Sequence, residues 1–204
     1  HDEVANGRQR IPEMIWPGNA ASEFSKRRST LGAAITMTSP GVPMIFQGQE
    51  FLEDGYFQDT DPLDWSRAET FSGIRAMYRD LIALRRNRFG VSRGLRGGNL
   101  NVFHVNNNDK LIAYHRYDMG GVGDDVVVLA NFSNQTFTTY QIGLPRGGTW
   151  YLHFNSDSTL YDSSFGATAV GSLNATQGAR DGLGFQGSTA IGPYSVLIFS
   201  QQPR

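Results

Sequence analysis

Carboxylates next to an imidazole or an indole are the side chains in this sequence best suited to chemistry. His1 and Asp2 are adjacent, Glu50 follows an apolar run, and Asp64 is followed by Trp65. An ionised carboxylate accepts hydrogen bonds that are stronger than those between neutral groups. An imidazole can donate from one ring nitrogen while it accepts at the other. His1 and Asp2 are also compatible with a solvated chain terminus, so the elements that position these groups decide what they do.

Two helices and one buried strand are predicted for the first half of the chain. A helix is expected over residues 22–38, because its first residue is a serine that can accept N–H groups of the first turn and a Ser-Pro-Gly run ends it. The apolar run 42–46 fits a strand buried on both faces, which places residues 47–50 at its C-terminal end. After a loop rich in acids and aromatics, apolar residues at helical spacing predict a helix over 67–87.

From residue 101 onward, short apolar stretches alternate with turns. Strands are predicted at 102–105, 111–115, 126–130, 136–142, 149–154 and 195–200. Closely spaced strands of this kind indicate an antiparallel sandwich or a small barrel. Residues 155–192 are rich in Gly and Ser and are expected to form a long loop with marginal strands.

The predicted fold class is therefore α/β followed by all-β. A single parallel strand with two helices cannot satisfy its own edges, so residues 1–92 are interpreted as the last βα units of a (β/α)8 barrel. Residues 93–204 are interpreted as a C-terminal antiparallel β-sandwich domain, with the boundary in the glycine cluster at 88–98. The chain opens without Met or a signal-peptide pattern, and it is expected to begin inside a longer protein.

Composition excludes several classes of function. The net charge of −1 leaves no electrostatic footprint for nucleic acid or an anionic membrane. The absence of cysteine removes disulfide frameworks and Cys-based metal sites; it suits a cytoplasmic protein and is compatible with a secreted one. No apolar run approaches the roughly 20 residues that span a bilayer. His104, His115 and His153 fall in predicted strands without metal-ligand spacing, so they are interpreted as structural and no metal is predicted.

Four segments, in this order, resemble glycoside hydrolase family 13, the α-amylase family, and most closely the C-terminal portion of its branching-enzyme and α-amylase members. His1-Asp2-Glu3-Val4 resembles the fourth sequence region, where an HD pair ends barrel strand seven. Residues 41–50 resemble barrel strand eight and the loop after it. Residues 62–65, with the helix that follows, resemble a downstream segment of branching-enzyme-like members, and residues 193–198 resemble the last strand of the C-terminal β domain.

The resemblance implies retaining cleavage of α-1,4 or α-1,6 glucosidic bonds, in which a nucleophile and an acid/base carboxylate lie about 5–5.5 Å apart. It adds a third carboxylate that binds sugar hydroxyls and stabilises the transition state. Asp2 stands in the place of that third acid, and His1 matches the neighbouring histidine that bonds the same sugar. The other two carboxylates lie on earlier barrel strands of the family. The chain alone is therefore expected to be inactive, and the mechanism needs no cofactor.

Two alternative roles are open for Glu50 and for the pair Asp64 and Trp65. Glu50 either faces substrate or anchors the barrel through buried hydrogen bonds. Asp64 and Trp65 either contact sugar, because an indole face stacks on a pyranose ring, or close the barrel rim. Arg8 and Arg10 are expected to be solvated loop charges. In the β domain, aromatic side chains are expected in the core or at its packing surface rather than as glycan ligands: Trp150, Tyr151, Tyr161 and Tyr194.

Within the family, the sequence favours branching, the transfer of a 1,4-α-glucan to a 6-hydroxyl, with α-amylase-type hydrolysis as the alternative. The loop at 3–21 lacks the glycine-lysine segment expected of branching enzymes, which weakens the transferase reading. An alternative of another class is a non-catalytic carbohydrate-binding module. The predicted partner is an α-glucan such as starch, glycogen or a maltooligosaccharide. Apolar faces that would pack on absent barrel strands also predict self-association.

Overall fold

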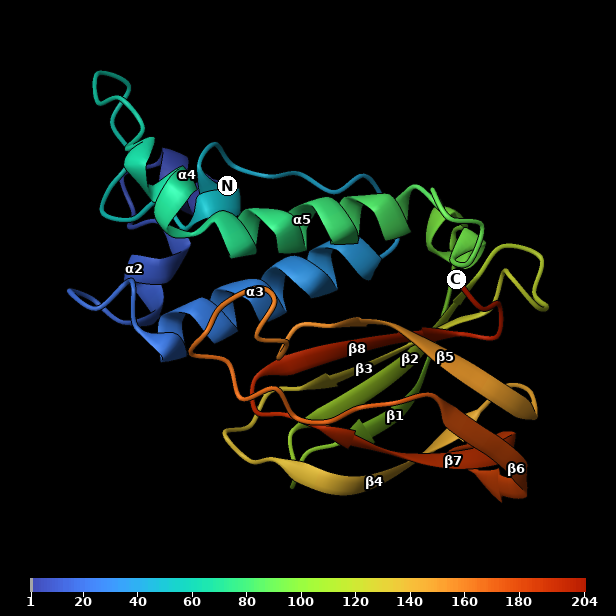
Figure 1. Cartoon of the computed structure of the whole chain (residues 1–204). Helices are drawn as coiled ribbons and strands as arrows, with labels where there is room; N and C mark the ends of the chain where they lie inside the picture. Colours follow the sequence, from blue (N-terminus) through green and yellow to red (C-terminus); the bar gives the residue numbers. More distant parts are fainter. Residues whose placement is uncertain (1) are drawn as a thin grey trace.

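The structure is a computed structural model that describes residues 2–204, in which a helical segment precedes an all-β domain. The helices are α1 (Asp2–Ala5), α2 (Ile11–Ile15), α3 (Glu23–Thr38), the 3-10 helix η1 (Gln49–Phe51), α4 (Ser66–Thr70), α5 (Ser72–Arg85) and the 3-10 helix η2 (Arg93–Arg96). The strands are β1 (Asn99–Asn106), β2 (Leu111–Tyr117), β3 (Val126–Asn131), β4 (Phe137–Leu144), β5 (Gly148–Asn155), β6 (Leu173–Arg180), β7 (Leu183–Ile191) and β8 (Ser195–Ser200). Figure 1 shows α3 and α5 lying along one face of the β domain.

The predicted helix at 22–38 is confirmed, and the one at 67–87 is divided. The hydroxyl of Ser22 accepts from the N–H of Ser25 at 3.2 Å and caps α3 as expected. In the second case, Phe71 takes φ −106° and ψ 37°, outside the helical region, and separates α4 from α5. The break brings Gly73 directly against the carbonyl of Tyr161, where an added Cβ would lie 2.1 Å from the oxygen.

The predicted strand at 42–46 is wrong. These residues connect α3 to η1 without belonging to a strand, and Val42 and Met44 are 98% and 51% exposed. The apolar run was assigned to a buried strand, but a strand needs a neighbour to pair with. Residues 2–204 place no strand beside this segment.

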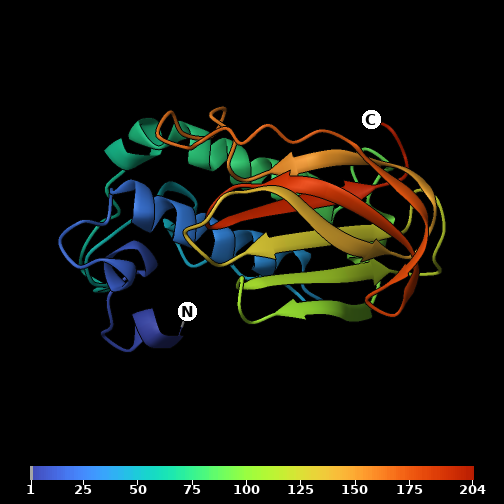
Figure 2. The same cartoon turned by 90° about the horizontal axis from the view of Figure 1, so that it is seen from below.

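The eight strands form an antiparallel sheet in the order β1-β2-β3-β8-β5-β6-β7-β4, which folds over into a sandwich. From below, its strands lie in front of the helices, while α1 and α2 extend beyond its end (Figure 2). Side chains alternate between two cores, as strand geometry requires. On β3, Val126 and Val128 join a cluster that includes α3 and α5, whereas Val127 and Leu129 face the interior of the sandwich. The predicted all-β architecture is thus confirmed.

Two strands, β6 and β7, occupy part of the region expected to be a long loop. They pair through a two-residue turn in which Asp181 and Gly182 both have positive φ, 53° and 76°. Positive φ at both central residues is the type I′ geometry that twists with the strands, and Asp-Gly is among its preferred sequences. The Gly and Ser content of the region concealed this signal.

The N-terminal half of α3 is attached to the β domain by two ion pairs. Arg27 and Asp157 form a pair whose side chains are 5% and 0% exposed. Lys26 contacts Asp162 through Nζ and Oδ1 at 2.7 Å. Both aspartates belong to the loop between β5 and β6, so this loop and α3 are held together by charge as well as by apolar packing.

The C-terminal end of α3 is held by an arginine from the β domain. Arg116 on β2 is fully buried and donates to the carbonyl of Thr38, the last residue of α3. Its other N–H groups donate to the carbonyls of Gly97 at 2.5 Å and Asn99 at 3.0 Å. A buried guanidinium is tolerated only when its donors are satisfied, and four separate carbonyls do so here, the fourth being that of Leu95 at 3.4 Å. Both ends of α3 are therefore fixed to the β domain, the first through the β5–β6 loop and the last through β2.

Acid is expected to destabilise the fold through three aspartates. Burial alone would raise the pKa of Asp157, Asp162 and Asp125, but hydrogen bonds, led by those from Arg27, Lys26 and His115, bring each pKa below its ordinary value. A depressed folded-state pKa contributes stability that is complete above the unfolded value of about 3.9 and is lost as pH falls through the folded pKa. Urea midpoints should therefore fall below about pH 4. The urea midpoint of the Asp162→Asn variant should fall less steeply with decreasing pH than that of the unmodified protein. Equal pH dependences of the two midpoints would contradict this account.

Candidate functional site

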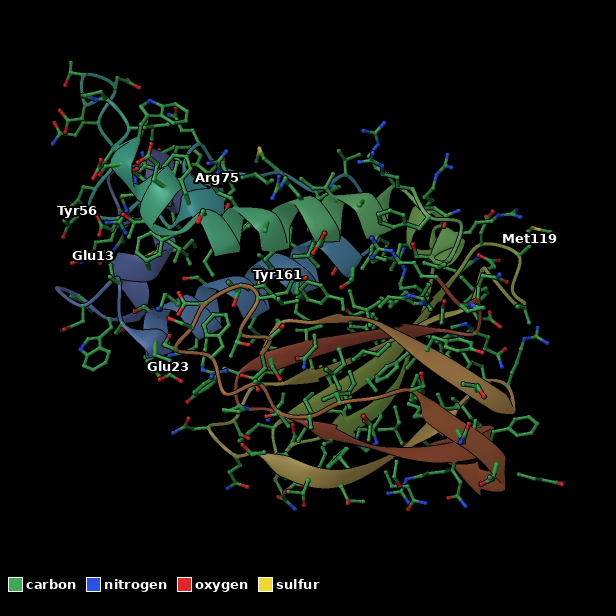
Figure 3. The ribbon with its side chains drawn as sticks, viewed as in Figure 1. Glu13, Glu23, Tyr56, Arg75, Met119 and Tyr161 are labelled. Atoms are coloured by element: carbon green, nitrogen blue, oxygen red, sulfur yellow. The ribbon has the colours of Figure 1, made fainter. Side chains whose placement is uncertain are left out.

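The candidate residues collect at the end of the helical segment that lies away from the β domain. There α1, α2, η1 and α4 come together, with the loop between η1 and α4 projecting beyond them (Figure 1). Figure 3 shows Tyr56 and Glu13 at this same end. Residues 2–19 are thus placed against residues 46–67, and an antiparallel bridge between Gln9 and Tyr56 joins the two segments.

Arg10 lies at the centre of this junction and is only 7% exposed, so the expectation of a solvated charge was wrong. Its backbone N–H donates to the carbonyl of Gly55 at 2.7 Å, and its Nη1 donates to the carbonyl of Gln47 at 2.6 Å. The guanidinium lies 5.5 Å from the ring centroid of Phe46 and 5.7 Å from that of Phe57. Burial lowers the pKa of Arg10, although nearby acids oppose the shift.

A second arginine fixes the far side of the same turn. Arg67 at the start of α4 contacts Asp54 through Nη1 and Oδ2 at 2.7 Å, and its Nε donates to the carbonyl of Leu52 at 3.0 Å. The turn needs Gly48, whose φ is +83° and where a Cβ would lie 2.6 Å from Glu53. Arg10 and Arg67 therefore hold the residue 47–57 turn from both sides.

Asp2 begins α1 on the surface of this junction and is exposed. Two residues later, Val4 is buried and lines a hollow of about 460 Å³ together with Phe46 and Gln49. The structure thus brings the helix that carries Asp2 next to the end of the 42–46 segment. His1 lies outside the described residues, so its predicted role stays a prediction.

Glu50 faces the interior of the helical segment. Its Oε2 is buried and has no hydrogen-bond partner among residues 2–204. It lies close to the phenol of Tyr78 on α5, whose pKa is raised, first by burial and then by the charge of Glu50. A hydrogen bond from Gln49 opposes that shift. The carboxylate of Glu50 therefore lies between η1 and α5.

Asp64 and Trp65 lie on the outer side of the junction. Asp64 accepts from the N–H and hydroxyl of Ser66 at 3.0 and 2.6 Å, and these bonds lower its pKa. Its own N–H donates to the carboxylate of Glu53 at 3.2 Å. Trp65 is 67% exposed, with its ring centroid 5.4 Å from that of Phe51. An indole supported from below and open above can stack on a flat apolar face.

Glu53 is a further acidic residue of the junction, which sequence reasoning missed. It lines a small hollow with Val4 and Arg10, and it also accepts from Asp64. Glu53 is brought here by the turn at Gly48. The spacing of residues 47–53 in the sequence does not predict that turn. Together the junction offers carboxylates that accept from hydroxyl groups and an indole face, a combination suited to a polyhydroxylated ligand.

Other classes of site receive no support from the described residues. Across residues 2–204, no group of three or more His, Asp or Glu side chains could hold a metal ion. In the same part of the chain, no helix has the length and apolar character needed to cross a bilayer. Three histidines lie in strands and bond to protein groups, as expected: His104 to Tyr140, His115 to Asp125 and His153 to Ser200.

The aromatic residues of the β domain mostly serve packing. Trp150 is fully buried in the sandwich core. The hydroxyl of Tyr161 donates to Asp80 on α5 at 2.7 Å, and the ring of Tyr194 packs edge-on against Phe24 on α3 at 5.4 Å. The expectation of core and interface roles is confirmed for these three residues.

Sequence comparison finds one domain family and a set of long relatives. The α-amylase C-terminal all-beta domain family matches residues 103–202. The 1,4-alpha-glucan branching enzyme GlgB of Burkholderia thailandensis is 29% identical over 98% of this chain and 24% of its own length. The enzyme of the same name from Prochlorococcus marinus is 28% identical over 100% of this chain and 27% of its own. The chain thus spans about a quarter of the length of these relatives.

Solved structures share the fold. A pullulanase from Anoxybacillus sp. LM18-11, crystallised with maltotetraose, superposes with a TM-score of 0.61 at 17% identity, covering 94% of this chain and 26% of its own. The α-amylase from H. orenii superposes with a TM-score of 0.57 at 16% identity, covering 87% of this chain and 36% of its own. The similarity includes the helical segment as well as the β domain, because coverage exceeds the β domain alone.

Proposed function

This chain belongs to the α-amylase family, glycoside hydrolase family 13, as its C-terminal region, and from this premise we propose that it is part of a retaining α-glucan branching enzyme. Residues 1–92 are assigned to the last part of the catalytic (β/α)8 barrel and residues 93–204 to the C-terminal β domain. The supporting observation is that branching enzymes match the whole chain, from α1 to β8, rather than the β domain alone.

In the proposed enzyme, Asp2 binds hydroxyls of the sugar whose bond is broken. Charge-assisted hydrogen bonds that tighten as this ring distorts lower the barrier rather than only aiding binding. His1 bonds the same sugar. The nucleophile and the acid/base come from earlier barrel strands, so the 204-residue chain alone does not turn over glucan.

Of the other junction residues, one stabilises the packing of the helices and two contact the sugar. Glu50 anchors η1 against α5, as its buried oxygen and its proximity to Tyr78 suggest. Trp65 offers its open indole face to a sugar ring of the α-glucan, and Asp64 accepts from that sugar's hydroxyls. The acceptor in branching is a glucan 6-hydroxyl. Attack by water at the same step would give α-amylase-type hydrolysis.

A chimera tests this proposal. The corresponding C-terminal quarter of the Burkholderia branching enzyme is replaced by this chain, and products from amylose are analysed by linkage. We expect new α-1,6 branches, and Asp2→Asn should lower kcat/KM on the order of 100-fold because transition-state hydrogen bonds are lost.

Glu3→Gln is the matched control, since Glu3 is the next acid in α1 and its side chain is 71% exposed in a loose pair with Arg8. It should change the rate less than about twofold. Reducing sugars without new branches would assign hydrolysis instead. A folded chimera in which Asp2→Asn is as active as Glu3→Gln would refute the role of Asp2. Maltoheptaose binding by the chain, with a chimera inactive throughout, would favour a binding module.

A further inference from the structure

The outer face of α5 carries a row of arginines that the proposed catalytic function does not use. Arg75, Arg79, Ile82 and Arg86 recur at intervals of four, three and four residues, so they share one side of the helix. Figure 3 shows Arg75 on the side of α5 away from the β domain. The row therefore faces outward, and the opposite side of α5 packs into the core.

The chain then reverses and adds another arginine to the row. Asn87 has φ +53°, and the N–H groups of Asn87 and Arg88 donate to the carbonyls of Leu84 and Ala83, each at 2.9 Å. These two bonds are the Schellman ending of a helix. They bring Arg88 back to the groove of about 440 Å³ that is lined by Arg79, Ile82, Ala83, Arg86 and Arg88. The position of the Arg88 guanidinium is therefore set by the backbone geometry of the helix end.

The residues that line this groove include no carboxylate. Among the ion pairs of residues 2–204, none includes Arg79, Arg86 or Arg88. A second hollow of about 450 Å³ adjoins the first through Arg86 and adds Arg85 and Arg96. A protein with a net charge of −1 thus concentrates unpaired positive charge at one place.

We propose that this groove binds a small ligand that carries a phosphate monoester. Guanidinium groups bind phosphate through paired N–H donors and do so better than ammonium groups. Arg79 and Arg86 are seven residues apart, or about 10 Å along the helix, so they grip a ligand from two ends. Ile82 and Ala83 form an apolar floor between them that suits the C–H face of a sugar ring. The groove is far smaller than a protein partner needs and within the usual range for small molecules.

Calorimetric titration of the 204-residue chain at low salt tests the assignment, with glucose 1-phosphate, inorganic phosphate and glucose as probes. We expect saturable binding of glucose 1-phosphate, none of glucose, and weaker binding as salt rises. Arg79→Gln with Arg86→Gln should weaken binding at least tenfold. The matched control, Arg8→Gln with Arg93→Gln, removes the same charge from exposed arginines elsewhere and should change affinity less than twofold.

The outcomes separate cleanly. Inorganic phosphate binding as tightly as the sugar phosphate would support the site and assign recognition to the phosphate group. Equal losses in the two double variants would overturn the proposal, because the effect would then be one of net charge. Glucose binding as tightly as its phosphate, or no saturable binding of any probe, would also overturn it. None of these results depends on the catalytic proposal, since no turnover is measured.

Discussion

Replacing Asp157 by alanine is expected to lower the free energy of unfolding by about 3–5 kcal/mol, the usual cost of breaking a buried ion pair from one side. Asp157 is fully buried and pairs with Arg27, and it also accepts from the N–H groups of Gly166 and Thr168, each at 2.9 Å. Its removal leaves the buried guanidinium of Arg27 with only the exposed Glu23 as an acidic partner, and it leaves two loop N–H groups unsatisfied. Urea unfolding followed by circular dichroism at pH 7 measures the loss.

Glu23→Gln is the control for this experiment, because Glu23 contacts the same arginine at 2.7 Å but is 52% exposed. It should cost less than about 1 kcal/mol. The double variant Arg27→Leu with Asp157→Ala should be more stable than the sum of the two single losses predicts, since no unpaired charge is left. Losses that are additive, or a Glu23 effect as large as that of Asp157, would contradict the account.

Replacing Trp150 by alanine is expected to cost about 3–5 kcal/mol through the cavity it leaves. Trp150 is the largest fully buried side chain of the described residues and lies in the sandwich core. Its indole N–H donates to the carbonyl of Arg146 at 3.1 Å, so the turn before β5 loses a hydrogen bond as well. The same urea experiment provides the measurement.

Trp65→Ala removes the same side chain from an exposed position and should cost less than about 1 kcal/mol. Trp150→Phe should recover part of the loss, because the ring refills most of the volume while the N–H is still missing. A Trp150→Ala variant as stable as Trp65→Ala would show that the core closes around the vacancy.

The elements that the sequence predicted well are those set by local physics. Ser22 followed by a helical stretch and a Ser-Pro-Gly stop located α3 to within one residue. Strands with strong apolar content, such as β3 and β8, were found because both faces of each are buried. The Asp181-Gly182 turn was an available signal that composition obscured, so only marginal strands were expected where β6 and β7 form.

The elements that could not be predicted depend on distant partners. The 42–46 run is as apolar as a buried strand, yet strand pairing requires a neighbour that local sequence does not specify. Arg10 is buried because Gln47 and Gly55, about 40 residues later, supply its acceptors. In the candidate site, the resemblance gave residue types at Asp2, Glu50 and Trp65, whereas the supporting turn around Gly48 was visible only in three dimensions.

Because α3 is attached at both ends, we expect the helical segment and the sandwich to unfold together. Arg27 holds the start of this helix to the β5–β6 loop, and Arg116 holds its last carbonyl. Separating the helices from the strands would strip charge partners from both sides at once. We therefore expect the contact between the helical segment and the sandwich to resist bending, because these buried charge partners would have to separate.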